Sequence, residues 1–383
     1  MSGPARAIAI PLLIFILFTG CDSNHDEEIP VGQSIGITQS FPKIASWLAK
    51  KDAIIDSGRA YNLIMTGWVT PEEAESLRSN SSVVKIYAGL SCNWIFADEE
   101  WLKFLTTVAS YGKDIPLEIK GSMYLRDRNG DKCAFGWASE VWGHEEIYAM
   151  DPRSTEWVEL IVAFYKNVLA QPQHDGIIVD MVTEKSWCPQ AINDDEWVTA
   201  TKAIMAHIRE INAGNKPVIF NSGRDFSEID EYRDFMDGYI MENFLGKQFG
   251  ATFDEGMKAA ESGYIIIYAV DTDDTGIKDV ARMRLGLTLS LLNDNTYFTY
   301  DVGSRDHGDA WWFAEYDADL GLPLDKYYEQ GGGYRRDFEK GTVVCAPHED
   351  VTISFTEQHT DISTGQRGTS FTVCTGDGRI FIE

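Results

Sequence analysis

The sequence predicts a (β/α)8 barrel, an α/β fold, with a small C-terminal β extension. Short apolar runs alternate with amphipathic segments of helical period, about eight such runs occur, and two of them are nearly the same. The two similar runs are DGIIVD at 175–180 and DGYIMEN at 237–243, each an Asp-Gly turn followed by an apolar strand and a carboxylate. Strands that alternate with helices predict a parallel sheet, and eight units that close on themselves predict a barrel.

The expected strands are apolar runs that follow turn signals. They lie at residues 61–68, 82–89, 116–124, 176–182, 217–221, 238–244, 264–270 and 296–302. Helical patterns lie at 157–169, 196–211, 253–261 and 277–292, with Pro71, Asp151-Pro152 and Asp274 as start signals. An open doubly wound sheet is the competing architecture. The barrel is favoured because residues 60–73 contain neither GxGxxG nor the P-loop pattern.

Four segments follow from this pattern. Residues 1–20 read as a leader, 21–35 as an acidic tether, 36–336 as the barrel and 337–383 as the β extension. After residue 337 the pattern changes to short β-like runs with glycines between some of them. We expect these runs to pack on the barrel, with a separate module as the alternative.

The leader has the features of an export signal. Arg6 precedes an apolar run at 8–18, which is too short to span a bilayer comfortably, and Thr19, Gly20 and Cys21 follow. This resembles a prokaryotic lipoprotein signal, in which cleavage before Cys21 leaves that cysteine to carry lipid. An uncleaved anchor helix and an ordinary secretion signal are the alternatives. Each alternative places the globular part outside the cytoplasm, at the cell surface or in the periplasm.

Net charge limits the range of partners. The chain has 33 basic and 60 acidic residues and a formal net charge of −27 at pH 7. Because nucleic-acid binding rests on clustered Lys and Arg, the composition excludes nucleic acid as a partner. The acidity indicates a solvated surface and argues against polyanionic substrates, whereas neutral and cationic polymers remain open.

Five cysteines remain when that of the leader is set aside. In an exported chain Cys345 and Cys374 form a reasonable disulfide within the β extension. Cys92, Cys133 and Cys188 follow the second, third and fourth expected strands, so two of them are expected to join at one rim of the barrel. The histidines are scattered and neither CxxC nor HExxH spacing occurs, so we expect no metal site and no cofactor.

Asp180 and Glu242 are the candidate catalytic pair. They end the two similar runs, on the fourth and sixth expected strands, and the carboxyl ends of barrel strands carry catalytic groups. Glycoside hydrolysis needs one protonated and one ionised carboxyl group. Two strands apart, the Cα atoms lie roughly 10 Å from each other. Side chains that lean inward then fit either the roughly 5 Å separation of retaining enzymes or the roughly 6.5 to 9.5 Å of inverting ones.

Other polar and aromatic residues lie at or near the ends of the expected strands. Aromatic faces stack on sugar rings while polar side chains bind hydroxyl groups. The candidate substrate-binding residues are Lys120, Tyr124, Trp187, Asn221, Arg224, Tyr268, Asp271, Tyr300, Asp301 and Arg305, with Trp94, Trp137 and Trp142 in loops of the same rim.

Several motifs resemble those of a known family. DGIIVD at 175–180, NSG at 221–223, MEN at 241–243, WWFAEYDADLGLPL at 311–324 and YRRDFEKGTVVCAP at 334–347 look like the barrels grouped as hypothetical glycosyl hydrolase family 15. The chain is similar, more distantly, to the endo-α-1,4-polygalactosaminidase barrels. The resemblance covers about residues 40 to 383. It implies a glycosidase with Asp180 and Glu242 as the strand-end carboxylates. Ala346-Pro347 departs from the Asn-Pro common in the family's tail, which puts one tail contact in doubt.

We therefore expect an exported, lipid-anchored glycosidase that acts on a polysaccharide or oligosaccharide. Asp180 is expected to be the nucleophile, or the ionised carboxylate, and Glu242 the proton donor. The rival hypothesis is a non-catalytic carbohydrate-binding barrel on the cell surface, which needs the aromatic rim but not both carboxylates. A metal-dependent deacetylase or esterase is a weaker third hypothesis, because neither clustered histidines nor a GxSxG motif occurs.

Overall fold

The computed structural model describes residues 41–80, 84–135, 146–223, 226–242, 244–246, 249–303 and 307–383. The predicted leader and tether, Cys21, Trp137, Trp142, Arg224 and Arg305 lie outside the described residues. Among the described helices, none is both long enough and apolar enough to cross a membrane.

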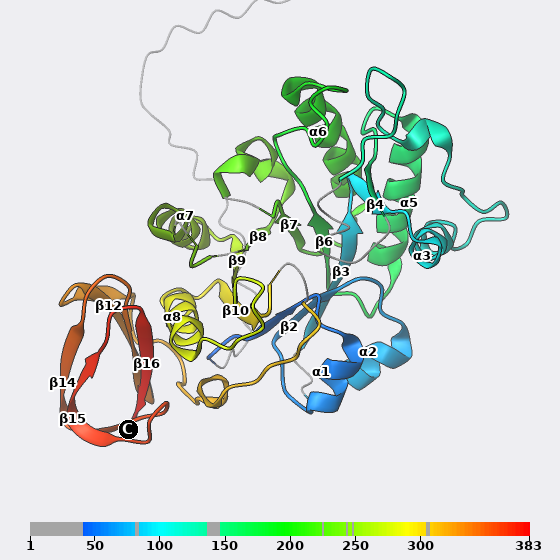
Figure 1. The fold of residues 1–383 in the computed structure, drawn as a ribbon. Helices are drawn as coiled ribbons and strands as arrows, with labels where there is room; N and C mark the ends of the chain where they lie inside the picture. The colour runs from blue at the N-terminus through cyan, green and yellow to red at the C-terminus, as the bar shows by residue number, and fades with distance from the viewer. Residues whose placement is uncertain are drawn as a thin grey trace, which may run out of the picture. The chain divides into compact units, whose positions relative to one another are not determined.

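Eight parallel strands form the barrel, as the sequence predicted (Figure 1). In order around the sheet they are β1 (Ala45–Trp47), β2 (Leu63–Thr66), β3 (Lys85–Ser91), β6 (Gly176–Asp180), β7 (Val218–Asn221), β8 (Gly238–Met241), β9 (Ile265–Asp271) and β10 (Thr296–Asp301). The first and last strands meet where Ile44 bridges Phe298 in parallel, and the Phe298 N–H donates to the Lys43 carbonyl at 3.0 Å.

One expected strand is wrong and one real strand was missed. Residues 116–124 form no strand of the barrel; they run as a loop that ends in a 3-10 turn, η1 (Gly121–Met123). Leu117 and Ile119 do pack on the core, which explains the alternating pattern, but the segment pairs only through an isolated antiparallel bridge of Tyr124 with Met150 and with no strand of the barrel. The real first strand is β1, whose three residues are too few to give a periodic signal.

The predicted helices are confirmed. They are α5 (Thr155–Ala170), α6 (Asp194–Ile211), α7 (Phe249–Glu261) and α8 (Val280–Ser290). The structure also contains α1 (Lys51–Ser57), α2 (Pro71–Arg78) and α3 (Glu99–Ala109), for which no range was predicted. Pro71 begins α2 behind a capping box made by Thr70 and Glu73. The other two helices begin later than their predicted start signals. Ser154 caps α5 and Asp279 caps α8, and each side chain accepts from the backbone N–H three residues further along the chain.

A second, antiparallel sheet follows the barrel. Its strands, in spatial order, are β11 (Tyr328–Gln330), β12 (Gly333–Phe338), β13 (Gly341–Ala346), β16 (Asp377–Ile382), β14 (Val351–Asp361) and β15 (Arg367–Val373). This confirms the C-terminal β extension, although the sheet begins at Tyr328, earlier than the expected boundary at residue 337.

The sheet packs directly on α8, which Figure 1 shows beside β16. At Gly378 in β16 a Cβ atom would lie 1.9 Å from Thr288 Oγ1 and 2.7 Å from the Arg284 carbonyl, so only glycine allows this approach. Arg284 reaches across and binds Asp377 through two hydrogen bonds of 2.8 Å each. Both side chains are largely buried, so the contact is a desolvated ion pair as well as an apolar interface.

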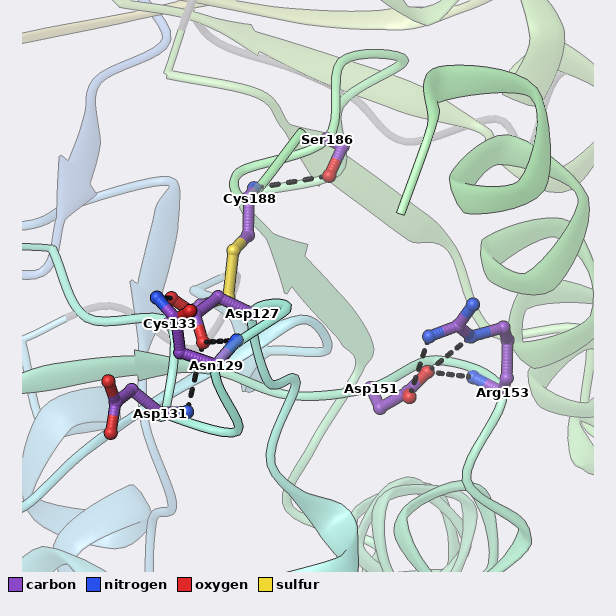
Figure 2. Close-up of a disulfide and its surroundings, with 8 residues drawn as sticks. All are labelled: Asp127, Asn129, Asp131, Cys133, Asp151, Arg153, Ser186 and Cys188. Atoms are coloured by element: carbon purple, nitrogen blue, oxygen red, sulfur yellow. Dashed lines mark hydrogen bonds and ion pairs between the residues drawn. A yellow bond between two sulfur atoms is a disulfide. The ribbon is translucent and has the colours of Figure 1, made fainter. Parts of the chain in front are cut away.

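A disulfide joins Cys133 and Cys188, with a Cα–Cα distance of 6.1 Å (Figure 2). The expectation that two of the three rim cysteines would pair is therefore confirmed, and Cys92 stays free and buried. The expected Cys345–Cys374 pair is wrong. Cys345 is buried in β13 while Cys374 is exposed beyond the end of β15, so both thiols are free.

Candidate active site

Asp180 and Glu242 line one cavity of about 400 Å³ at the carboxyl ends of the barrel strands. Asp180 is the last residue of β6, and Glu242 directly follows β8. The two carboxylates occupy equivalent positions because their runs are similar: in each, an Asp-Gly turn precedes or begins the strand and a carboxylate lies at its end. The cavity falls within the roughly 300 to 1,000 Å³ range of small-molecule sites.

The side-chain amide of Asn221 binds both carboxylates. Its Nδ2 donates to Asp180 Oδ1 at 2.9 Å and to Glu242 Oε1 at 3.1 Å. Asn221 is buried at the end of β7, the strand between β6 and β8. Two hydrogen bonds that diverge by about 120° from one amide nitrogen place the two acceptor oxygens about 5 Å apart.

Further hydrogen bonds anchor each carboxylate through the same oxygen. Trp47 Nε1 donates to Glu242 Oε1 at 2.8 Å, and the Met181 N–H donates to Asp180 Oδ1 at 2.9 Å. Met181 has a φ of 57°, in the left-handed region that disfavours residues with side chains, and such backbone strain is concentrated at functional sites. Among the described residues, these bonds fall on Oδ1 and Oε1 and leave Oδ2 and Oε2 for a substrate.

An aspartate–histidine pair stands beside Glu242. His307 lines the main cavity and also a small adjoining one, which it shares with Glu242, Asp271 and Asp301. His307 Nδ1 lies 2.8 Å from Asp301 Oδ2, and both side chains are largely buried. Burial lowers the pKa of His307, but the hydrogen bond and charge of Asp301, with Glu242 and Asp180 beyond, outweigh burial and raise it to about 9. The site therefore holds a cation at neutral pH.

Burial is the main reason why the pKa of Asp180 is high. Removal from water and the neighbouring charge of Glu242 raise it from 3.8 to about 7, against the hydrogen bonds from Asn221 and Met181. Burial also raises the pKa of Asp271 to about 6. Asp180 lies too close to Glu242 to ionise freely, so Asp180 keeps its proton up to about pH 7.

Asp180→Asn is expected to stabilise the protein at pH 8 and to leave its stability unchanged below pH 4. The folded pKa of Asp180 exceeds its unfolded value, so its stabilising contribution is fully present below about pH 4 and is lost as pH rises through about 7. Asparagine does not ionise, so the gain in unfolding free energy above pH 7 is on the order of 4 kcal/mol. Melting temperatures of both proteins from pH 4 to 9 measure it. Curves that stay parallel throughout this range would contradict the raised pKa.

The structure gathers some of the predicted binding residues and separates others. Asn221 and Trp94 line the main cavity, and Asp271 and Asp301 line the adjoining one. The predicted residues that line neither are Lys120, which pairs with Glu156, Tyr124, which packs on Tyr148, Trp187, which packs on Phe135, and Tyr268, buried against Phe244. Lys120 and Tyr124 were placed on the strand that does not form. Tyr300 also lines neither cavity, and its hydroxyl accepts from the N–H of Asp279, the N-cap residue of α8.

Several cavity residues were not predicted. Trp47 was missed because β1 was missed, and His307 because a lone histidine in the loop after β10 has no spacing signal. Phe96, Trp101 and Phe104 come from β4 (Trp94–Phe96) and α3, between β3 and β6. Among the residues that the structure describes, no three His, Cys, Asp or Glu side chains converge as metal ligands.

A larger cavity, of about 820 Å³, lies elsewhere, between α5 and α6. Helix residues and the turn before α5 line it, among them Val158, Val162, Ala200 and His207. No described strand end contributes to it. The smaller cavity is therefore the candidate active site, because it alone of the two combines strand-end carboxylates with a bridging amide.

Comparison with known proteins identifies a family. The model of a family described as "Hypothetical glycosyl hydrolase family 15" matches residues 120–342, which is more than half of the chain. No curated protein matches the sequence significantly.

Several solved structures with a similar fold are glycoside hydrolases. An α-galactosidase of Geobacillus stearothermophilus is 9% identical with a TM-score of 0.52, over 90% of this chain and 56% of that one, and so shows the fold. A maltogenic α-amylase of Thermotoga neapolitana is 9% identical (TM-score 0.48, 89% of this chain and 99% of that one). The glycoside hydrolase domain of PelA from Pseudomonas aeruginosa is 13% identical (TM-score 0.45, 70% and 97%).

Proposed function

The chain belongs to hypothetical glycosyl hydrolase family 15 and is a glycosidase, and on that premise we propose that Asp180 and Glu242 are the two carboxyl groups that cleave its O-glycosidic substrate. The observation that carries this proposal is the Asn221 amide, which binds one oxygen of each carboxylate in the floor of one cavity. A carbohydrate-binding barrel without catalysis has no need to hold two acids at this spacing and to bear the cost of their repulsion.

The spacing supports a retaining mechanism. Ideal geometry at the shared Asn221 amide places the two bridged oxygens about 5 Å apart, close to the roughly 5 to 5.5 Å of retaining enzymes, whereas inverting enzymes need roughly 6.5 to 9.5 Å to admit water. One carboxylate then attacks the anomeric carbon while the other protonates the departing oxygen. Water, deprotonated by that second group, later hydrolyses the glycosyl ester and restores both carboxyl groups.

The charges around the pair support Asp180 as the proton donor and Glu242 as the nucleophile. Glu242 accepts a hydrogen bond from Trp47 and lines a small cavity together with the cationic His307, so a donor and a positive charge lie beside this carboxylate. Asp180 has a pKa of about 7, which suits a group that must hold a proton and then release it. This assignment reverses the roles expected from the sequence.

For location and substrate, the proposal keeps the sequence-based expectations. The apolar run at 8–18 followed by Cys21 supports export and a lipid anchor on the membrane. The net charge of −27 supports a neutral or cationic polysaccharide as substrate.

The test of function is hydrolysis of neutral and amino-sugar polysaccharides by the purified protein. New reducing ends would support the glycosidase, and proton NMR of the first product would show the anomer of the substrate if the enzyme retains configuration. Release of the opposite anomer would overturn the retaining mechanism. Binding to a polysaccharide with no release on any substrate would favour the non-catalytic barrel.

His307→Gln is expected to shift the pH–rate profile to higher pH. His307 faces Asp301 on β10, Glu242 after β8 and Asp180 on β6, and its positive charge lowers the pKa of Asp180 and of Asp301. Without that charge the pKa of Asp180 rises further above its present value of about 7, so the alkaline limb of kcat/KM, which reports the proton donor, moves to higher pH. His207→Gln, on exposed α6, is the control. An unshifted profile in His307→Gln would show that the charge does not act on the pair.

A further inference from the structure

The residues that line the cavity include two chemically different groups, which we call its polar half and its aromatic half. Beside Glu242 stand polar and charged groups, His307 with Asp301 and Asp271 behind it. The other half is aromatic, built from Trp94, Phe96, Trp101 and Phe104.

The aromatic half is a rigid wall rather than a loose cluster. Phe96 packs edge to face on Trp94, with ring centroids 4.9 Å apart, and on Trp101 at 5.6 Å. Phe104 packs on Phe164 of α5 at 6.2 Å. Asp98 caps α3 by accepting from the Trp101 N–H at 2.9 Å, and this bond holds the backbone of Trp101 in place. Phe96, Trp101 and Phe104 are half-buried, so each ring keeps a surface for a ligand.

Backbone contacts tie this wall to the Asp180 side of the site. Ser91 of β3 pairs in register with Asp180, and Ser91 Oγ accepts from the Trp94 N–H at 3.2 Å. Asn93 Nδ2 donates to the carbonyl of Met181, the residue after Asp180, at 3.4 Å. Met181 also packs in the same apolar cluster as Trp94 and Phe96. A sugar on this wall would therefore lie next to Asp180.

We propose that the wall of Trp94, Phe96, Trp101 and Phe104 is the leaving-group subsite, which binds an uncharged sugar ring through its apolar face. The inference rests on the proposed function, in which Asp180 protonates the oxygen between the cleaved sugar and its neighbour. The sugar that is attacked then lies in the polar half, beside Glu242. The four side chains of the wall are uncharged, which suits an uncharged ring, and the basic residues among those that line the cavity are Lys50 and His307, outside the wall.

The enzyme then recognises the sugar that it releases as the leaving group as well as the sugar whose anomeric carbon is attacked. Stacking on aromatic rings tolerates different hydroxyl patterns but requires a ring with an apolar face. A substrate with a sugar on both sides of the cleaved bond is then preferred over one with a small leaving group, as expected for a polysaccharide.

The test compares Trp101→Ala with the unaltered protein on two substrates of the sugar identified by the hydrolysis panel. On an oligosaccharide, kcat/KM is expected to fall about tenfold or more, since one stacking surface is lost. On the glycosyl fluoride, which has no leaving sugar, kcat/KM is expected to stay within about twofold, which also shows that the variant is folded. Trp101→Phe keeps a ring and is expected to recover most of the loss.

Tyr111→Ala is the matched control, because Tyr111 lies just beyond the same helix, is 66% exposed and does not line the cavity. Equal losses on both substrates, or no loss on the oligosaccharide, would overturn the subsite while leaving the glycosidase intact. A protein that hydrolyses neither substrate would overturn the proposed function and the subsite together.

Discussion

Glu242→Gln is expected to lower kcat/KM by on the order of 10⁴-fold or more, and Asp180→Asn by about 10²- to 10⁴-fold. Glutamine at 242 cannot form the glycosyl ester, so both steps are lost. Asparagine at 180 removes only proton transfer, which contributes less. Reducing-end release from the polysaccharide that the unaltered protein hydrolyses measures both.

The leaving group separates the two roles. The dinitrophenolate of a dinitrophenyl glycoside departs without protonation, so Asp180→Asn is expected to form the glycosyl-enzyme on this substrate as the unaltered protein does. Added azide then attacks the glycosyl-enzyme and accepts the sugar, releasing the enzyme carboxylate. Glu242→Gln is expected to stay inactive. If Glu242→Gln is the variant that recovers, the roles revert to those expected from the sequence, with Asp180 as the nucleophile. Full activity of either variant would remove the pair from the mechanism.

The chain supplies its own matched controls. Asp175 and Asp237 are the first acids of the same two runs, at the opposite ends of the strands from Asp180 and Glu242. They bind Arg78 at 2.7 Å and Arg209 at 2.8 Å. Asp175→Asn and Asp237→Asn are expected to lower stability slightly and to leave kcat unchanged, because the bottom of a barrel serves stability rather than catalysis.

Removal of the disulfide is expected to cost about 4 kcal/mol of unfolding free energy. Cys133 and Cys188 are 55 residues apart in the sequence. Cross-linking a loop of that length lowers the conformational entropy of the unfolded chain, which raises its free energy by about 4 kcal/mol at 25 °C. Thermal unfolding of Cys133→Ser/Cys188→Ser beside the unaltered protein measures it. The same drop in melting temperature should follow treatment with a reductant. Cys374→Ser, an exposed free cysteine, is the control. Insensitivity to reductant would contradict a disulfide that stabilises the fold.

The barrel could be predicted because parallel strands buried on both faces give apolar runs between amphipathic helices. Two failures have clear causes. A three-residue strand such as β1 carries too little pattern, and residues 116–124 alternate because two side chains pack on the core, without a partner strand. Periodicity reports burial and does not report pairing.

The site divides in the same way. Asp180, Asn221 and Glu242 could be predicted because each ends an adjacent strand, and strand ends meet at one edge of the barrel. Trp47 was not predicted because β1, which contains it, was not predicted. His307 was not predicted because its role depends on a contact with Asp301 that only the fold brings to 2.8 Å. The cysteine pairing in the β extension failed because spacing does not show that Cys345 is buried within β13 while Cys374 lies exposed beyond the end of β15.

The close approach of Gly378 to α8 limits how the protein can be dissected. The matched segment, residues 120–342, omits β1, β2 and β3 and stops at the second residue of β13. An expression fragment cut to those limits would be an incomplete barrel. A fragment cut just after the barrel would expose the face of α8 that β16 covers and would leave the Arg284 guanidinium without its Asp377 partner. The C-terminal sheet is therefore a structural part of the enzyme, and a chimera that exchanges it for another module must rebuild that contact first.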